Sequence, residues 1–184
     1  SDLHAVWAGC QHELGVTGER EHVPLSRTPA LVTALTLALA GCLPEGVDDA
    51  CGPRRAVVEH VIDGDTIELR SGERVRYLLV DTPESTTHVE CFGAEAAAFN
   101  RSLVEGREVH LTYDTECTDA YGRLLAYVEL DGVSVNRVLV EEGYACVLQI
   151  APNGVELAPL FYDLETQAVD ERVGLWAVCV SSPC

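Results

Sequence analysis

The stretch RVRYLLVDTPE, residues 74–84, decides how we expect this chain to fold. It begins with the alternating side chains of a half-buried strand and ends in an apolar run, and Pro83 then stops strand pairing. Two similar segments precede it, RAVVEHVI at residues 55–62 and DTIELR at residues 65–70. SGE at residues 71–73 is typical of a turn. We therefore expect three consecutive strands here.

Further along the chain, the pattern of apolar residues predicts two more strands and several helices. Residues 107–113 and 123–130 favour strands, whereas residues 93–105, 136–142 and 154–173 carry apolar side chains at helical spacing. Five strands with a few helices predict an α+β, mainly β, fold. The count fits a five-stranded OB-fold barrel with about three α-helices.

Composition limits the classes of function. The chain has 184 residues, with 12 basic and 30 acidic side chains and a formal net charge of −18. A protein that coats nucleic acid needs a basic face, so this acidity argues against that class. It leaves room for a nucleic-acid enzyme with a small local cluster of arginines.

The N-terminal region has the pattern of a targeting segment. Residues 31–42 read LVTALTLALAGC, an apolar stretch that ends in small residues and Cys42 and resembles a bacterial lipobox. The alternative is a buried helix of a globular domain. We expect residues 1–41 to be an upstream segment and lipoprotein signal peptide, with translation starting near Val23. Residues 42–54 would be a lipid-anchor cysteine and flexible tether, and residues 55–184 the folded domain.

This assignment predicts a bacterial envelope protein, attached to the membrane through lipid on Cys42 or secreted. Of the eight cysteines, Cys10 then lies upstream of the expected start and Cys42 carries lipid. Six cysteines remain in an oxidising compartment, so we expect three disulfides. Zinc ligation is the alternative, but the chain has no CxxC pair.

Three short segments contain residues suited to chemistry. They are DGDT at residues 63–66, the strand end with Asp81 and Glu84, and DAYGR at residues 119–123. Taken alone, each could be an ordinary turn or helix cap. Together they offer carboxylates for a hard cation and arginines for phosphate. Arg76 lies five residues before Asp81, so an ideal pleat would point the two side chains to opposite faces.

In sequence, these segments closely resemble motifs of the staphylococcal nuclease (thermonuclease) family. The matching motifs are VIDGDT at residues 61–66, RYLLVDTPE at residues 76–84 and TDAYGRLLAY at residues 118–127. The resemblance implies an OB-fold, Ca²⁺-dependent nuclease that cleaves DNA, RNA or both and leaves 3′-phosphate products. A non-catalytic OB-fold module that binds nucleic acid or protein is the alternative.

The resemblance also implies roles for individual residues. The metal ligands would be Asp65, Asp81 and the backbone carbonyl of Thr82, and Asp63 would support the metal site. The catalytic residues would be Arg76, Arg123 and Glu84, with Glu84 as the general base. Tyr121 would contact a terminal phosphate. The chain departs from the family at Ala120, often a lysine, and at residues 146–150, which lack base-stacking aromatics. We expect altered substrate binding.

Alignment with the family also suggests how the six cysteines pair. It places Cys91 and Cys117 on loops that flank the active site, which implies a Cys91–Cys117 disulfide. Cys146–Cys179 and Cys51–Cys184 are the other expected pairs, and they would tie the C-terminal tail to the domain. We expect a monomer.

Overall fold

The computed structural model describes residues 50–86, 88–181 and 184. Several predictions for the N-terminal region lie outside these residues: the start site, the signal peptide, Cys10, the lipid on Cys42 and most of the tether. Among the described residues, no helix has both the length and the apolar character needed to cross a bilayer.

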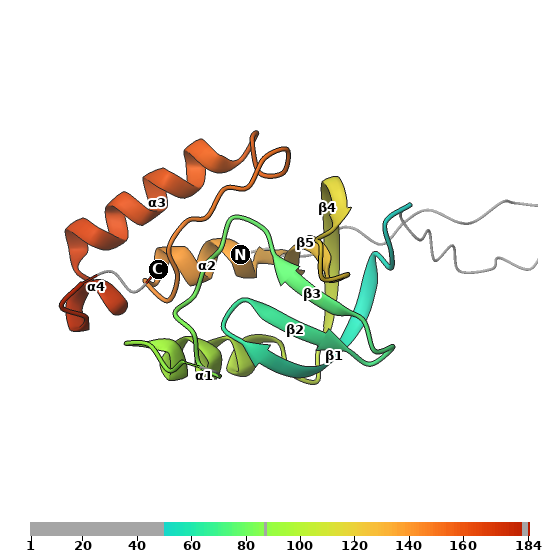
Figure 1. Cartoon of the computed structure of the whole chain (residues 1–184), viewed down its shortest axis with the longest axis horizontal. Helices are drawn as coiled ribbons and strands as arrows, with labels where there is room; N and C mark the ends of the chain where they lie inside the picture. The colour runs from blue at the N-terminus through green and yellow to red at the C-terminus, as the bar shows by residue number, and fades with distance from the viewer. Residues whose placement is uncertain (1–49, 87, 182–183) are drawn as a thin grey trace, which may run out of the picture. The chain divides into compact units, whose positions relative to one another are not determined.

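The strands form a closed barrel (Figure 1). Their bounds are β1 Arg55–Asp63, β2 Thr66–Leu69, β3 Arg74–Tyr77, β4 Glu108–Thr118, β5 Leu124–Leu130 and the short β6 Val133–Ser134. They pair in the order β3-β2-β1-β4-β5-β6, and a parallel pairing of β3 with β5 closes the ring of the first five. The expected five-stranded barrel is therefore confirmed, with β6 as a two-residue extension.

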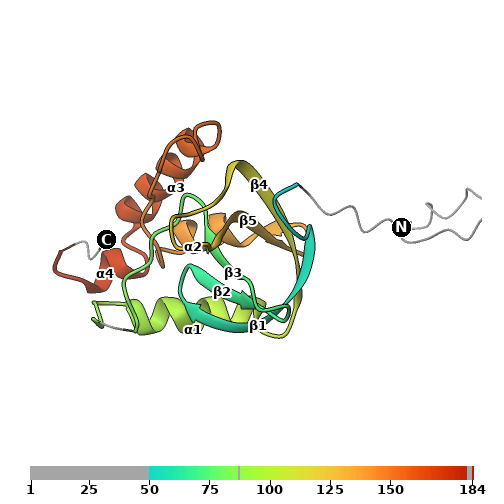
Figure 2. The same ribbon diagram turned by 45° about the vertical axis from the view of Figure 1, so that its right-hand side comes forward.

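Helices cover the barrel on two sides. The described residues contain α1 Gly93–Val104, α2 Val135–Glu141, α3 Ala158–Glu171 and the one-turn α4 Leu175–Val178. In Figures 1 and 2, α1 lies along β1 and β2, whereas α3 lies on the other side, beyond α2. The short α4 follows α3, and Cys179 at its end is bonded to Cys91 just before α1. The expectation of about three helices is confirmed, although α3 starts four residues later than its apolar spacing predicts.

The core fills the barrel and continues under α2 and α3. Its fully buried members include Val58, Ile67, Val75, Tyr77, Leu111, Val128, Leu139 and Phe161. These are inward-facing strand residues and the apolar faces of helices, as their alternation and helical spacing predict. The core holds the strand ends in place, and three of those ends carry the candidate site.

The third strand ends earlier than its sequence predicts. β3 stops at Tyr77, and Leu79 adopts a φ of 61°, a left-handed conformation that ends the extended backbone. Asp81 then forms an isolated antiparallel bridge with Cys146. The apolar run at residues 78–80 is buried as a turn instead of continuing the strand.

The six expected cysteines form three disulfides, as predicted, but all three expected pairings are wrong. The bonds are Cys51–Cys117, Cys91–Cys179 and Cys146–Cys184, in place of Cys91–Cys117, Cys146–Cys179 and Cys51–Cys184. Three disulfides are typical of an extracytoplasmic protein.

Antiparallel pairing of β1 with β4 explains the correction. Arg55 is opposite His110, so residues that precede β1 run beside the later part of β4, and Cys51 meets Cys117 there. Cys91 lies just before α1 and instead meets Cys179, which follows α4. The tail is tied to the domain as expected, but through Cys91 and Cys146.

Candidate active site

Asp65 occupies the turn between β1 and β2 and is almost fully buried. Its Oδ2 accepts hydrogen bonds from the Thr82 amide at 2.9 Å and the Thr82 hydroxyl at 3.1 Å. The neighbouring Gly64 packs against the same threonine, and a Cβ at that position would lie 2.6 Å from Thr82 Oγ1. The turn therefore needs glycine and fixes Asp65 against the chain that follows β3.

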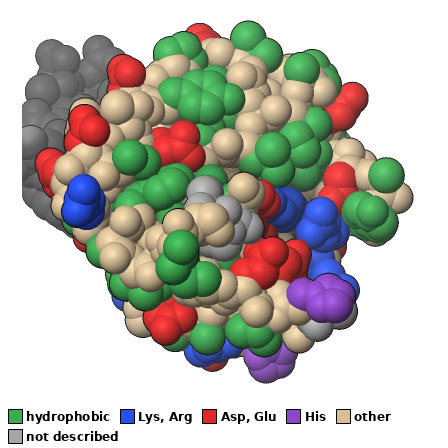
Figure 3. Space-filling model, turned by 60° about the vertical axis from the view of Figure 1, so that its left-hand side comes forward, with side chains coloured by type: hydrophobic (Ala, Val, Ile, Leu, Met, Phe, Trp, Pro, Cys, Tyr) green, Lys and Arg blue, Asp and Glu red, His purple; other side chains and the backbone are tan. Residues whose placement is uncertain are grey.

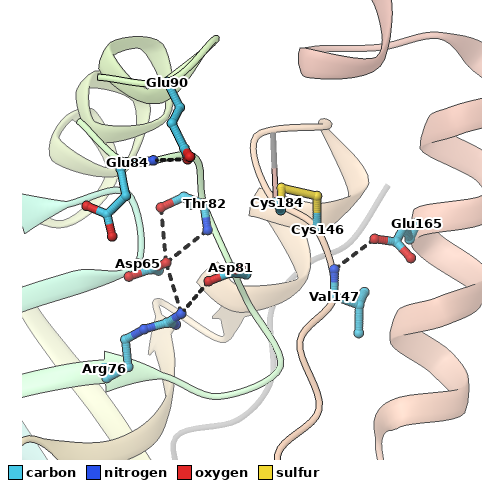
Figure 4. Close-up of a disulfide and its surroundings, with 10 residues drawn as sticks. All are labelled: Asp65, Arg76, Asp81, Thr82, Glu84, Glu90, Cys146, Val147, Glu165 and Cys184. Carbon is cyan, nitrogen blue, oxygen red and sulfur yellow. Dashed lines mark hydrogen bonds and ion pairs between the residues drawn. A yellow bond between two sulfur atoms is a disulfide. The ribbon is translucent and has the colours of Figure 1, made fainter. Parts of the chain in front are cut away.

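Arg76 joins the two expected metal-binding carboxylates (Figure 4). Its Nη2 lies 2.8 Å from Asp81 Oδ1 and 3.2 Å from Asp65 Oδ2. Its Nη1 donates to the backbone carbonyls of Tyr77 and Val80. The turn at Leu79 reverses the alternation of an ideal strand, and this reversal brings Asp81 to the same side as Arg76.

Glu84 is exposed, and its backbone forms two hydrogen bonds with Glu90. Its amide donates to Glu90 Oε2 at 2.9 Å, and its carbonyl accepts from the Glu90 amide at 2.9 Å. Asp63 lies nearby, where its Oδ1 accepts from Ser85 Oγ at 2.7 Å and from the Gly64 amide at 2.8 Å. Asp63 therefore links the β1–β2 turn to the residue that follows Glu84.

Negative charge is crowded at this end of the barrel. Burial raises the pKa of Asp81; Arg76 opposes this effect, whereas Asp65 and Glu90 add to it. The pKa of Glu84 is also raised, by burial first and then by the carboxylates of Asp63, Asp65 and Glu90. Asp63, Asp65, Asp81, Glu84 and Glu90 thus gather at this end, and among these five Arg76 forms ion pairs with only Asp65 and Asp81. The excess of negative charge favours an added cation.

The oxygen atoms available at this site are of the kind that bind a hard cation. Asp65 and Asp81 offer carboxylate oxygens, and Thr82 offers a backbone carbonyl, the ligand types that Ca²⁺ takes. Among the described residues, no group of three or more His, Cys, Asp or Glu side chains is arranged to hold a metal. A cation here would therefore need the carbonyl and water in addition to the two carboxylates.

Arg123 is fixed in the turn between β4 and β5 by Asp119. Arg123 Nε donates to Asp119 Oδ2 at 2.7 Å, and the Arg123 amide donates to Oδ1 at 3.0 Å. Burial alone would raise the pKa of Asp119, but the hydrogen bonds from Arg123 and from the Tyr121 amide lower it. The guanidinium also lies 5.6 Å from the centre of the Tyr121 ring.

A pocket of about 410 Å³ brings the two arginines together. Arg76 and Arg123 both line it, together with Tyr121, which is 86% exposed. Leu148 and Ile150 form an apolar part of its wall. These two residues come from the stretch that lacks aromatics, so the pocket presents aliphatic rather than aromatic surface there.

Sequence reasoning missed three residues that set this geometry. Asp119 orients Arg123, Glu90 holds Glu84, and Ser85 connects to Asp63. An aspartate four residues before an arginine, in a turn that contains glycine, is a local signal that could have identified Asp119. Glu90 had no such signal, because its contact with Glu84 depends on the path of the loop.

The fold and the site define a small barrel with carboxylates and arginines at the ends of its strands. The family described as staphylococcal nuclease homologue matches residues 74–178. The chain belongs to this family.

Similar proteins have nuclease names. Endonuclease YncB of Bacillus subtilis (strain 168) is 37% identical over 127 residues, covering 65% of this chain and 60% of that protein. The SPbeta prophage-derived endonuclease YokF of the same organism is 35% identical over 127 residues, covering 65% of this chain and 43% of that protein. A thermonuclease of Staphylococcus intermedius is 37% identical over 126 residues, 65% of this chain and 74% of that protein.

Proposed function

We propose that this chain is a Ca²⁺-dependent nuclease that hydrolyses phosphodiester bonds of DNA, RNA or both and leaves 3′-phosphate products. The observation that carries the proposal is the position of Arg76. It pairs with Asp65 and Asp81 on one side, and on the other it lines a pocket with Arg123. Carboxylates for a cation and guanidinium groups for phosphate thus meet at one end of the barrel.

In this proposal, Asp65, Asp81 and the Thr82 carbonyl hold the cation. A bound Ca²⁺ would supply Lewis-acid stabilisation of charge on the phosphoryl oxygens. Asp63 supports this end through Gly64 and Ser85.

Glu84 orients the attacking water and accepts its proton, a role that suits an exposed carboxylate with a raised pKa. Arg76 and Arg123 donate hydrogen bonds to phosphate oxygens and stabilise the transition state. Two backbone carbonyls and Asp119 fix the planes of these guanidinium groups before substrate arrives.

The pocket beside the arginines would receive the sugar and base next to the cleaved bond. Tyr121, which lines this pocket and is exposed, would contact a terminal phosphate. Leu148 and Ile150 would pack against a base by apolar contact, so base binding is weaker than on stacked aromatics. We also propose that the protein is a monomer anchored in the bacterial envelope by lipid on Cys42. An intact-mass measurement of the native protein tests the lipid, and light scattering of the protein in detergent tests the monomer.

The test of the proposed function is digestion of plasmid DNA and of RNA with Ca²⁺ and with chelator. Glu84→Gln should lower the turnover rate by about 100-fold or more, since a general base contributes about that much. Arg123→Ala should lower it to a similar extent. Matched controls are Glu171→Gln and Arg137→Ala, both exposed positions on α3 and α2.

The outcomes separate the two functional classes. The nuclease is supported if the parent chain digests nucleic acid, chelator stops this digestion and both site variants reduce it. Undiminished digestion by both variants would refute the assigned roles. Binding of nucleic acid without digestion would favour a non-catalytic OB-fold module.

A further inference from the structure

The proposed metal ligand Asp81 and the proposed general base Glu84 lie on a segment that has no regular secondary structure. This acidic segment, residues 81–86 and 88–91, carries Asp81, Thr82 and Glu84 and lies between β3 and α1. Such a segment has no ladder of backbone hydrogen bonds to fix it, so its position depends on a few individual contacts. Two of these contacts lead to the C-terminal cysteines.

At the start of the acidic segment, Asp81 is paired with Cys146. The Asp81 amide donates to the Cys146 carbonyl at 2.9 Å, and the Cys146 amide donates to the Asp81 carbonyl at 2.8 Å. Figure 4 shows that the Cys146 side chain is bonded to Cys184, and that the Val147 amide points to Glu165 on α3. The segment that pairs with Asp81 is thus itself bonded to Cys184 and to α3.

At the other end, Cys91 anchors the loop that contains Glu84. Glu90 forms both hydrogen bonds to the Glu84 backbone, and the next residue, Cys91, is bonded to Cys179. Cys179 is fixed in turn, because its amide donates to the Leu175 carbonyl of α4 at 2.9 Å. The loop is therefore tied to α4 one residue after the contacts that hold Glu84.

We propose that Cys184 and Cys179 are positioning residues for the active site. Cys184 acts through Cys146 on Asp81, and Cys179 acts through Cys91 on Glu84. The reason is geometric: a displacement of about 1 Å at reacting groups can cost about 100-fold in rate. This inference rests on the proposed roles of Asp81 and Glu84.

The third disulfide provides a matched control. Cys51–Cys117 joins the residues before β1 to the end of β4 and does not bond to the acidic segment. Its sequence separation of 66 lies between the 38 of Cys146–Cys184 and the 88 of Cys91–Cys179. Because loop-closure entropy grows with the logarithm of loop length, the three bonds should contribute similarly to overall stability.

The first experiment measures the Asp81 end in the full-length oxidised chain. In Cys146→Ala/Cys184→Ala, the backbone amides of residues 81 and 146 should exchange about 10-fold faster or more than in the parent, as in local opening. The dissociation constant for Ca²⁺, measured by calorimetry, should rise by about 10-fold to 100-fold, as on loss of a group that orients a metal ligand. Amides of β1 and β4 should keep their protection, which shows that the barrel is folded.

The second experiment measures the Glu84 end. Cys91→Ala/Cys179→Ala should lower kcat about 10-fold or more, whereas its Ca²⁺ dissociation constant should change less than that of the first variant. Cys51→Ala/Cys117→Ala should lower the unfolding temperature about as much as the other two double variants do. In this control, the Asp81 amide should keep its protection from exchange and the affinity for Ca²⁺ should not fall.

Equal effects of all three variants on exchange, Ca²⁺ affinity and kcat would overturn the proposal and leave only a general role in stability. Unchanged protection at Asp81 in the first variant would overturn it as well. If the parent chain digests no nucleic acid, the proposed nuclease function fails on its own, while the exchange and calorimetry measurements still test the role of the C-terminal cysteines.

Discussion

At the scale of single residues, the pairing of Arg76 with Asp81 links stability to cation binding. Arg76 offsets part of the cost of placing Asp81 beside Asp65, yet burial still raises the pKa of Asp81. A raised pKa means that the folded state binds the proton more tightly than the unfolded state does. Ionised Asp81 therefore costs stability, and this cost appears as the pH rises through the interval between the unfolded and folded pKa values.

Asp81→Asn tests this sign. In chelator at neutral pH, the variant should unfold at a temperature no lower than the parent. The gain should be less than about 1 kcal/mol, because the Asp81 side chain is 33% exposed and its charge is screened. At acid pH, where Asp81 is protonated, the two proteins should converge. Scanning calorimetry measures this, and a clear loss at neutral pH would mean that the ion pair with Arg76 is net stabilising.

Glu84 and Glu90 form a second linked pair. A general base works only when ionised, so hydrolysis should fall as the pH drops through the raised pKa of Glu84. Glu90→Gln removes one of the negative charges that raise this pKa, while the amide oxygen can still accept from the Glu84 amide. The acid limb of the kcat/KM profile should move to lower pH, and Glu95→Gln on α1 is the control. An unmoved limb in Glu90→Gln would contradict the assignment.

At the scale of elements, the start of α1 positions the acidic segment by close packing. A Cβ on Gly93, the first residue of α1, would lie 2.3 Å from the Glu84 carbonyl oxygen and 2.9 Å from that of Pro83. No side chain fits there unless the backbone moves. The helix and the loop that carries Glu84 therefore act as one packed unit.

Gly93→Ala should consequently lower both stability and turnover. We expect a loss of about 1–3 kcal/mol in the free energy of unfolding, the usual cost of overpacking. The turnover rate should also fall, because the Glu84 backbone must shift. Urea unfolding and digestion assays measure the two effects, with Ala94→Ser at the exposed next position as the control. Full activity in Gly93→Ala would show that the position of Glu84 tolerates this shift.

At the scale of the whole molecule, most of the arginines in the described residues are paired with acidic groups. At least seven of the ten arginines in the described residues form ion pairs with acidic groups: Arg55, Arg70, Arg74, Arg76, Arg101, Arg107 and Arg123. On the face drawn in Figure 3, a group of basic side chains lies directly beside acidic ones. With a net charge of −18, the surface should repel nucleic acid away from the site.

This charge distribution predicts a weak salt dependence of binding. If Arg76 and Arg123 make the main phosphate contacts, the logarithm of the DNA association constant should fall with the logarithm of salt concentration with a slope of about −2. The measurement uses Glu84→Gln with Ca²⁺, so that bound DNA is not cleaved, and Glu84→Gln/Arg123→Ala should halve the slope. A slope steeper than about −5 would indicate a broader basic surface.

The local patterns of the sequence predicted much of the fold. Alternation over residues 55–62 and 65–70 corresponds to β1 and β2, and apolar spacing over residues 93–105 corresponds to α1. These patterns are reliable because neighbouring side chains along one element decide which face is buried. The candidate site residues were identified from three short motifs and their resemblance to the nuclease family, and their catalytic roles remain predictions.

What the sequence by itself determined is therefore most of the elements, the six cysteines that pair and the residues available for chemistry. The tertiary structure alone decided which of them meet. It placed Asp81 beside Arg76 through the turn at Leu79, and it paired Cys51 with Cys117 through the register of β1 and β4. Both contacts depend on the path of the backbone between distant segments, which is set by closure of the barrel and not by any local pattern of residues.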